Sequence, residues 1–268
     1  MAIRHLLWGA ALAAALPVTL VAQQASPGFH MVYCVKVKSG KGADFRAMLN
    51  GDYRKLQQSR VDSGALSGWI ALRTVVPRGR EATCDYAFVS FYPGLPSAPM
   101  SNEEITADLQ KAGIGSSAEQ LDQQENAVGH LVYNSIDRTA LHVGAAKKGD
   151  FIVVNDMKVT DTDAWIGNEK KLWQPIFEDG VKDGSVDGWS VIVQFMPRGS
   201  EDRATTYTVD IYPSWDAVYK FFGPDFDARW KKIHPDVPLD QGYAQEHKLD
   251  TITHTTLYEV VDAIQPSK

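Results

Sequence analysis

The fold of this chain is decided by a stretch that occurs twice. Residues 61–93 read VDSGALSGWIALRTVVPRGREATCDYAFVSFYP, and residues 181–213 read VKDGSVDGWSVIVQFMPRGSEDRATTYTVDIYP. At a constant offset of 120 residues, 11 of the 33 aligned positions are identical, and Gly, Trp and Pro are prominent among them. Such a repeat indicates two copies of one structural unit.

Each copy carries the same order of elements. Alternating residues predict the strands of the first unit at 30–38, 69–76, 85–92 and 128–136, and those of the second at 151–160, 189–196, 205–212 and 251–262. Apolar residues at helical spacing follow the first strand of each unit, and Ser101 to Glu104 reads as a capping box for a later helix. Strand–helix–strand–hairpin–strand–helix–strand is the ferredoxin-like order.

This duplicated order resembles the dimeric α+β barrel superfamily, in which two ferredoxin-like units pack sheet against sheet. The resemblance covers residues 30–262 and rests on element order and duplication. It implies an α+β protein of two tandem ferredoxin-like units, whose antiparallel four-stranded sheets pack as an intramolecular pseudo-dimeric barrel. The expected organisation is a signal peptide at 1–25, a first unit at 28–137, a linker at 138–150 and a second unit at 151–264.

The N-terminus and the charge indicate an exported protein. Arg4 and His5 precede an almost uncharged apolar stretch, Leu6 to Leu20, and small residues follow at 22–25, as in a secretory signal peptide. We therefore expect a periplasmic or extracellular protein with no membrane segment after signal removal. The formal net charge of −6 and the lack of a basic run argue against nucleic-acid binding.

Alternation along the strands separates two faces of each sheet. The apolar phase of the third strands is expected to pack against the helices; it comprises Ala87, Val89 and Phe91 in the first unit and Tyr207, Val209 and Ile211 in the second. The opposite phase is then expected to point into the barrel.

This inward phase predicts an acidic face in the second unit. Asp156 and Asp210 would lie on neighbouring strands, with side chains about 5–8 Å apart. Lys158, Tyr212 and, from the last strand, His254 complete the candidate ligand-binding set. Two enclosed carboxylates imply pairing, a raised pKa or a bound cation. An ordinary ion pair of Asp156 and Lys158 at a wet rim is the alternative.

The first unit carries Cys34, Ser90 and Tyr92 at matching positions, and these are further ligand-binding candidates. An oxidising compartment permits a disulfide between Cys34 and Cys84, and the sequence leaves that bond open. The histidines form no close metal-binding pattern, so no metal site is expected, and no motif implies a cofactor. Haem-binding members of the superfamily rely on an axial His, but no local motif here selects one, and haem stays open.

These observations predict a secreted or periplasmic small-molecule-binding protein whose reaction the sequence does not name. The expected partner is a small, partly apolar molecule held in one unit or between the sheets. One alternative is a cofactor-independent monooxygenase-like or isomerase-like enzyme that uses Asp156, Asp210 and Tyr212 for proton handling. A second alternative is a non-catalytic structural or assembly protein. Formation of a homo-oligomer is compatible with each of these.

Overall fold

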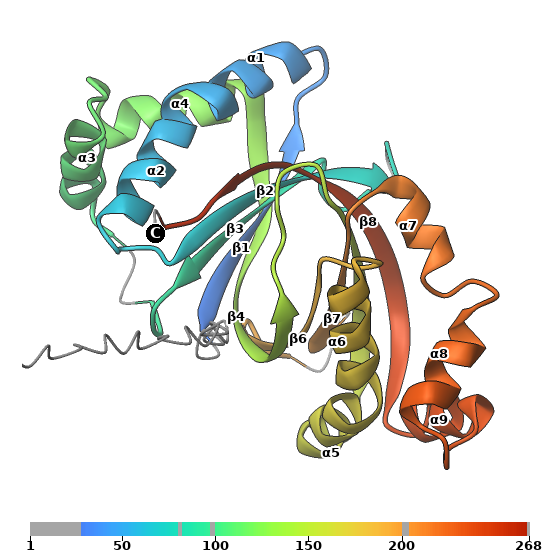
Figure 1. The fold of residues 1–268 in the computed structure, drawn as a ribbon. Helices are drawn as coiled ribbons and strands as arrows, with labels where there is room; N and C mark the ends of the chain where they lie inside the picture. Colours follow the sequence, from blue (N-terminus) through green and yellow to red (C-terminus); the bar gives the residue numbers. More distant parts are fainter. Residues whose placement is uncertain (1–27, 80–81, 97–99, 200–203, 267–268) are drawn as a thin grey trace, which may run out of the picture.

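The computed structural model describes residues 28–79, 82–96, 100–199 and 204–266 (Figure 1). The signal peptide predicted at residues 1–25 lies outside the described residues and stays a prediction. None of the helices in the described ranges is both long and apolar enough to cross a membrane.

The first unit folds in the predicted order. Its elements are β1 (Phe29–Val37), α1 (Gly42–Met48), η1 (Leu49–Tyr53), α2 (Arg54–Asp62), β2 (Gly68–Val76), β3 (Tyr86–Tyr92), α3 (Asn102–Lys111), α4 (Ala118–Val128) and β4 (Gly129–Gly144). The segment η1 is a π-helical turn between α1 and α2. The predicted capping box is present, because the Ser101 side chain accepts from the backbone N–H of Glu104 while Glu104 accepts from the backbone N–H of Ser101.

The second unit repeats this order and adds one helix that the sequence pattern did not predict. Its elements are β5 (Phe151–Val159), α5 (Thr162–Asn168), η2 (Glu169–Trp173), α6 (Gln174–Asp183), β6 (Gly188–Met196), β7 (Thr206–Tyr212), α7 (Trp215–Lys220), α8 (Phe226–Ile233), α9 (Leu239–Glu246) and β8 (Asp250–Ile264). The unpredicted helix is α9, which leads directly into β8. The π-helical turn η2 stands 120 residues after η1, so the repeat extends to this irregularity.

The strands form one closed antiparallel barrel in the order β1-β3-β2-β8-β5-β7-β6-β4. Each unit contributes four neighbouring strands in the ferredoxin-like arrangement, and the units join where β2 pairs with β8 and β4 pairs with β6. Figure 1 shows α1–α4 on the outside of the first half of the barrel and α5–α9 outside the second half. The predicted fold class is confirmed, and the barrel closes within one chain.

The predicted linker at 138–150 is wrong in its first half. Strand β4 continues to Gly144, because residues beyond the pairing with β1 find a second partner in β6. Gly144 ends the strand with a φ of 68°, and a Cβ there would lie 2.0 Å from the Asp187 carbonyl oxygen, so only glycine fits. Only residues 145–150 connect the units outside a strand.

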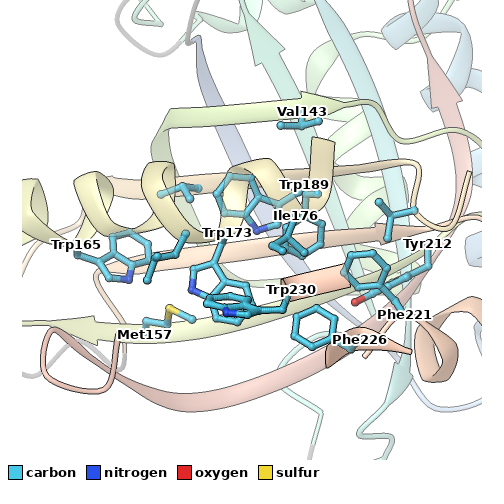
Figure 2. Close-up of a cluster of buried hydrophobic side chains, with 14 residues drawn as sticks. Val143, Met157, Trp165, Trp173, Ile176, Trp189, Tyr212, Phe221, Phe226 and Trp230 are labelled. Carbon is cyan, nitrogen blue, oxygen red and sulfur yellow. The ribbon is translucent and has the colours of Figure 1, made fainter. Parts of the chain in front are cut away.

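The face prediction for the third strands is also wrong. The apolar phase fills the barrel interior, where Ala87, Val89 and Ile211 pack with Leu72, Ile152 and Val260. The opposite phase packs under the helices, where Phe88 meets Phe45 and Tyr212 belongs to the cluster drawn in Figure 2. A closed barrel covered by helices buries both faces of its strands. Apolar alternation therefore cannot tell the inner face from the outer one.

Candidate functional site

The predicted acidic face does not exist as one surface. Strand β5 pairs with β7 so that Val153 lies opposite Asp210 and Asp156 lies opposite Tyr207. Because successive side chains alternate, Asp156 and Asp210 point to opposite faces of the sheet. The prediction that they share a face is wrong, because Asp156 is three residues from Val153, the residue opposite Asp210.

The structure separates the other candidates as well. His254 lies directly opposite Asp156 on the inner phase of β8 and β5, so these two are brought together. Lys158 is exposed. Ser90 and Tyr92 lie with Tyr212 on the phase that faces the helices. Ligand binding by any of these residues stays a prediction.

Cys34 is not available as a free thiol. It is bonded to Cys84, with 5.2 Å between the two Cα atoms. The disulfide that the sequence left open is therefore present, and it ties β1 to the residues just before β3.

Asp210 belongs instead to a group on the helix side of the second sheet. We call Glu169, Asp210, Glu246 and Asp250 the acidic cluster. One carboxylate oxygen of each of Glu169, Glu246 and Asp250 lies within 4.8 Å of the other two. The Asp210 carboxyl is close enough for its charge to raise the pKa of Glu169 and of Glu246.

Four elements place these side chains. Glu169 starts the π-helical turn η2, an irregularity that is frequent at functional sites. Glu246 is the last residue of α9, and Asp250 is the first residue of β8, so the short connection between these elements brings both carboxyls to one edge of the helix layer. Asp210 reaches the same layer from β7, opposite Trp189 of β6.

Indole groups surround the cluster. The Trp165 Nε1–H donates a hydrogen bond of 2.9 Å to Asp250 Oδ2. The Trp173 indole lowers the pKa of Glu246, although its Nε1–H has no well-formed hydrogen bond. The Trp173 ring also packs against Trp230 and Tyr243, with 5.4 Å between ring centroids in each case. Figure 2 shows the three Trp side chains in one aromatic layer between the sheet and its helices.

Burial leaves polar atoms of the cluster unsatisfied. Glu169 is 1% exposed, and its Oε1 has no hydrogen-bond partner. Glu246 Oε2 is buried and lacks a partner too. The carboxyls of Glu169 and Glu246 also hydrogen-bond each other, which requires that one of them carry a proton. Buried polar atoms in folded proteins nearly always have a partner, so the two remaining oxygens are exceptions that need an explanation.

Burial is also the largest cause of the raised pKa values of the four carboxyls in the acidic cluster. It raises the pKa of Asp210 to about 7, against a smaller lowering by the Tyr212 hydrogen bond. It raises the pKa of Glu246 to about 8, and neighbouring Asp250 adds to the effect. The pKa of Glu169 lies well above its usual value because of burial and the charges of Glu246, Asp250 and Asp210, and burial raises the pKa of Asp250. Such groups either carry protons near neutral pH or share a cation.

Sequence reasoning found Asp210 and missed the other three acids. Glu169 stands 120 residues after Leu49, so a charged residue occupies a core position of the helix pattern. Glu246 and Asp250 are four residues apart at the start of the last strand, as Glu125 and Gly129 are in the first unit. Comparison of the two units position by position distinguishes Glu169 from Leu49 and Asp250 from Gly129, whereas Glu246 matches Glu125 and gives no signal.

A different feature of the surface is an open groove of about 450 Å³ on the first unit. It lies between α1, η1 and α4, and Met48, Gly51 and Gln124 are among its lining residues. Its lining residues all belong to the first unit, and none of them belongs to the acidic cluster.

No family model and no curated protein matches this chain. Solved structures do match it. The "putative monooxygenase" of Fusobacterium nucleatum is 11% identical, with a TM-score of 0.52 over 91% of this chain and 96% of that one. The "putative monooxygenase" of Lactobacillus acidophilus is 10% identical, with a TM-score of 0.49 over 89% and 98%. A "putative chlorite dismutase" is 12% identical, with a TM-score of 0.44 over 88% and 96%.

At such identities the likeness is one of fold alone. It agrees with the observed strand order, the duplication and the closed barrel. The chain therefore has the fold of the dimeric α+β barrel proteins, with both ferredoxin-like units carried in tandem.

Proposed function

We propose that this chain is an isomerase-like enzyme that moves a proton on a small, partly apolar molecule at the acidic cluster. Asp210 is the proposed proton acceptor, and its hydrogen bond with Tyr212 holds it in place. The observation that supports this most is that Asp210 is buried among aromatic rings, beside polar atoms that lack partners. Reactive carboxyls gather in such environments.

Comparison with the first unit indicates that the scaffold does not need Asp210. Ser90 occupies the register position of Asp210, opposite Trp69 as Asp210 is opposite Trp189. Tyr92 and Tyr212 likewise stand opposite Phe29 and Phe151. The equivalent strands of the first unit pair with Ser90 at this position. The second unit therefore does not need the Asp210 carboxyl in order to form its sheet.

Burial suits the carboxyl to proton transfer. Withdrawing a carboxylate from water destabilises its charged form and makes it a stronger base than in solution. General-base catalysis is most effective when the pKa lies near the working pH, and the Asp210 pKa of about 7 meets that condition. The neighbouring rings, Trp173 and Trp230 among them, make the surroundings of the carboxyl apolar.

The test uses a small aromatic reporter of carboxylate bases, 5-nitrobenzisoxazole, whose ring opens when a base removes its C–H proton. The wild-type chain should accelerate this reaction, and Asp210→Asn should lower the rate by about 100-fold or more. Asp216→Asn, which changes an exposed acid on α7, is the matched control and should leave the rate unchanged.

Equal rates for the wild type and Asp210→Asn would overturn the proposal. Binding of the reporter without turnover would also overturn it, in favour of the small-molecule-binding module. No observation at the cluster favours the oxygenase-like form of the enzyme.

A further inference from the structure

Three carboxylates of the acidic cluster have the spacing of a cation site. One oxygen each of Glu169, Glu246 and Asp250 lies within 4.8 Å of the others. Oxygens on opposite sides of a bound Ca²⁺ are about 5 Å apart, because each Ca²⁺–oxygen bond is 2.3–2.6 Å long. Around Mg²⁺ the corresponding separation is about 4 Å. Separations of up to 4.8 Å therefore fit a hard divalent cation of either size.

The unsatisfied atoms point to the same conclusion independently of this spacing. Glu169 is 1% exposed, and its Oε1 has no hydrogen-bond partner, although its carboxyl and that of Glu246 hydrogen-bond each other. Within the described ranges, no Lys or Arg forms an ion pair with Glu169, Glu246 or Asp250. A buried carboxylate without a partner is costly, and a cation would supply the missing charge and the missing contact.

The indoles then act as supports for metal-binding carboxylates. The Trp165 Nε1–H fixes Asp250 through Oδ2, which leaves the second oxygen of that carboxylate free to bind a cation. Trp173 also lies beside Glu246, although its Nε1–H has no well-formed hydrogen bond. Ligating carboxylates are usually held by hydrogen bonds of this kind from a second layer of residues.

We propose that Glu169, Glu246 and Asp250 bind a hard divalent cation, for which Ca²⁺ serves as the probe. Three carboxylates and one such ion leave a single negative charge at the site. Six to eight oxygens surround Ca²⁺, so positions remain for water or for an oxygen atom of a bound molecule. The role of the ion beside Asp210 rests on the proposed function, whereas its binding does not.

The experiment is a titration of the purified full chain, freed of metal with a chelator, with Tb³⁺ as a luminescent substitute for Ca²⁺. Trp165 and Trp173 are close enough to sensitise Tb³⁺ emission at this site. We expect saturable sensitised emission that Ca²⁺ displaces. Glu169→Gln and Asp250→Asn should each weaken binding by more than about tenfold, whereas Asp216→Asn should not.

A second measurement guards against variants that fold poorly. Ca²⁺ should raise the thermal midpoint of the wild type above its value in chelator and should leave that of Asp250→Asn unchanged. Absence of sensitised emission in the wild type, or equal Tb³⁺ affinity in Glu169→Gln, would overturn the inference.

The two proposals fail separately. If the chain does not bind Tb³⁺ but still catalyses proton transfer, the cation site is excluded and the proposed activity stands. If Tb³⁺ binding requires Glu169 and Asp250 but the chain does not act on 5-nitrobenzisoxazole, the proposed activity is excluded and the cation site stands.

Discussion

The two units of this chain share a scaffold and differ in what they bury between sheet and helices. The first has Phe45, Leu49, Ser90 and Gly129 where the second has Trp165, Glu169, Asp210 and Asp250. Gly129 leaves no room for a carboxyl, since a Cβ there would lie 3.0 Å from the Lys36 carbonyl oxygen. The first unit has only Glu125, at the position of Glu246, in common with the four acids of the second unit.

Residues that break the rules for stable cores are expected at functional sites. The comparison teaches that the fold can be built without the acidic cluster. We therefore expect the acidic cluster to lower the free energy of unfolding, although the fold does not require it. Exchanging residues between equivalent positions of the two units tests this directly.

The largest expected effect concerns what the units share. Trp69 and Trp189 occupy equivalent positions and are at most 1% exposed. Trp69→Ala and Trp189→Ala should each lower the free energy of unfolding by about 3–5 kcal/mol, because each leaves a large cavity. Denaturant unfolding of both variants measures this. A loss confined to one of them would break the equivalence of the two units.

A smaller effect of opposite sign is expected at the position where the units differ most. Glu169→Leu installs the residue that the first unit has at Leu49, and in chelator it should raise the free energy of unfolding by about 1–4 kcal/mol. The matched control is Leu49→Glu, which buries a carboxyl without partners and should destabilise the chain. Destabilisation by Glu169→Leu in chelator would show that the carboxyl has a stabilising partner within the fold.

The smallest effect is a change with pH inside the barrel. His30 and Asp137 lie opposite each other there, where the second unit has Ile152 opposite Tyr258. Burial lowers the pKa of His30 from 6.5 to about 4 and raises the pKa of Asp137 from 3.8 to about 7. The contribution of His30 to the free energy of unfolding is complete above pH 6.5 and is lost as the pH falls through 4. The contribution of Asp137 is complete below pH 3.8 and is lost as the pH rises through 7.

The two slopes cancel between about pH 4 and 6.5 in the wild type and become visible when one partner is removed. In Asp137→Asn the free energy of unfolding should rise with pH in this window, and in His30→Gln it should fall, by up to about 1.4 kcal/mol per pH unit. Urea unfolding at several pH values measures both slopes. Slopes of the same sign in the two variants would contradict the assignment of a neutral pair.

The fold could be predicted from the sequence because the repeat fixes the number of units and their element order. The strands lie within two residues of their predicted starts, with β4 and β8 running longer at their ends. The extensions could not be predicted, since β4 gains its second half from pairing with β6, a partner remote in sequence. Alternation could not assign the faces, because residues such as Val89 and Phe88 are both buried on opposite sides of one strand.

The site could be predicted only in part for the same physical reason. Asp210 and Tyr212 were found as polar residues in a strand, but their partners come from η2, α9 and β8. Helix α9 carries few apolar residues at regular spacing, and so its pattern gave no signal. Glu169 was hidden in an otherwise apolar helix, where only its difference from Leu49 marks it.

Strand β4 has a consequence for how such a chain can be assembled. Because it lies between β1 and β6, and β8 lies between β5 and β2, neither half can close a barrel alone. A half cut at residues 145–150 would have two unpaired edges and would need another copy to cover them. In the intact chain the short connection keeps the partner at a high effective concentration at any dilution. In a homodimer every substitution occurs in both halves of the barrel. In the joined chain a residue can change in one half and stay unchanged in the other.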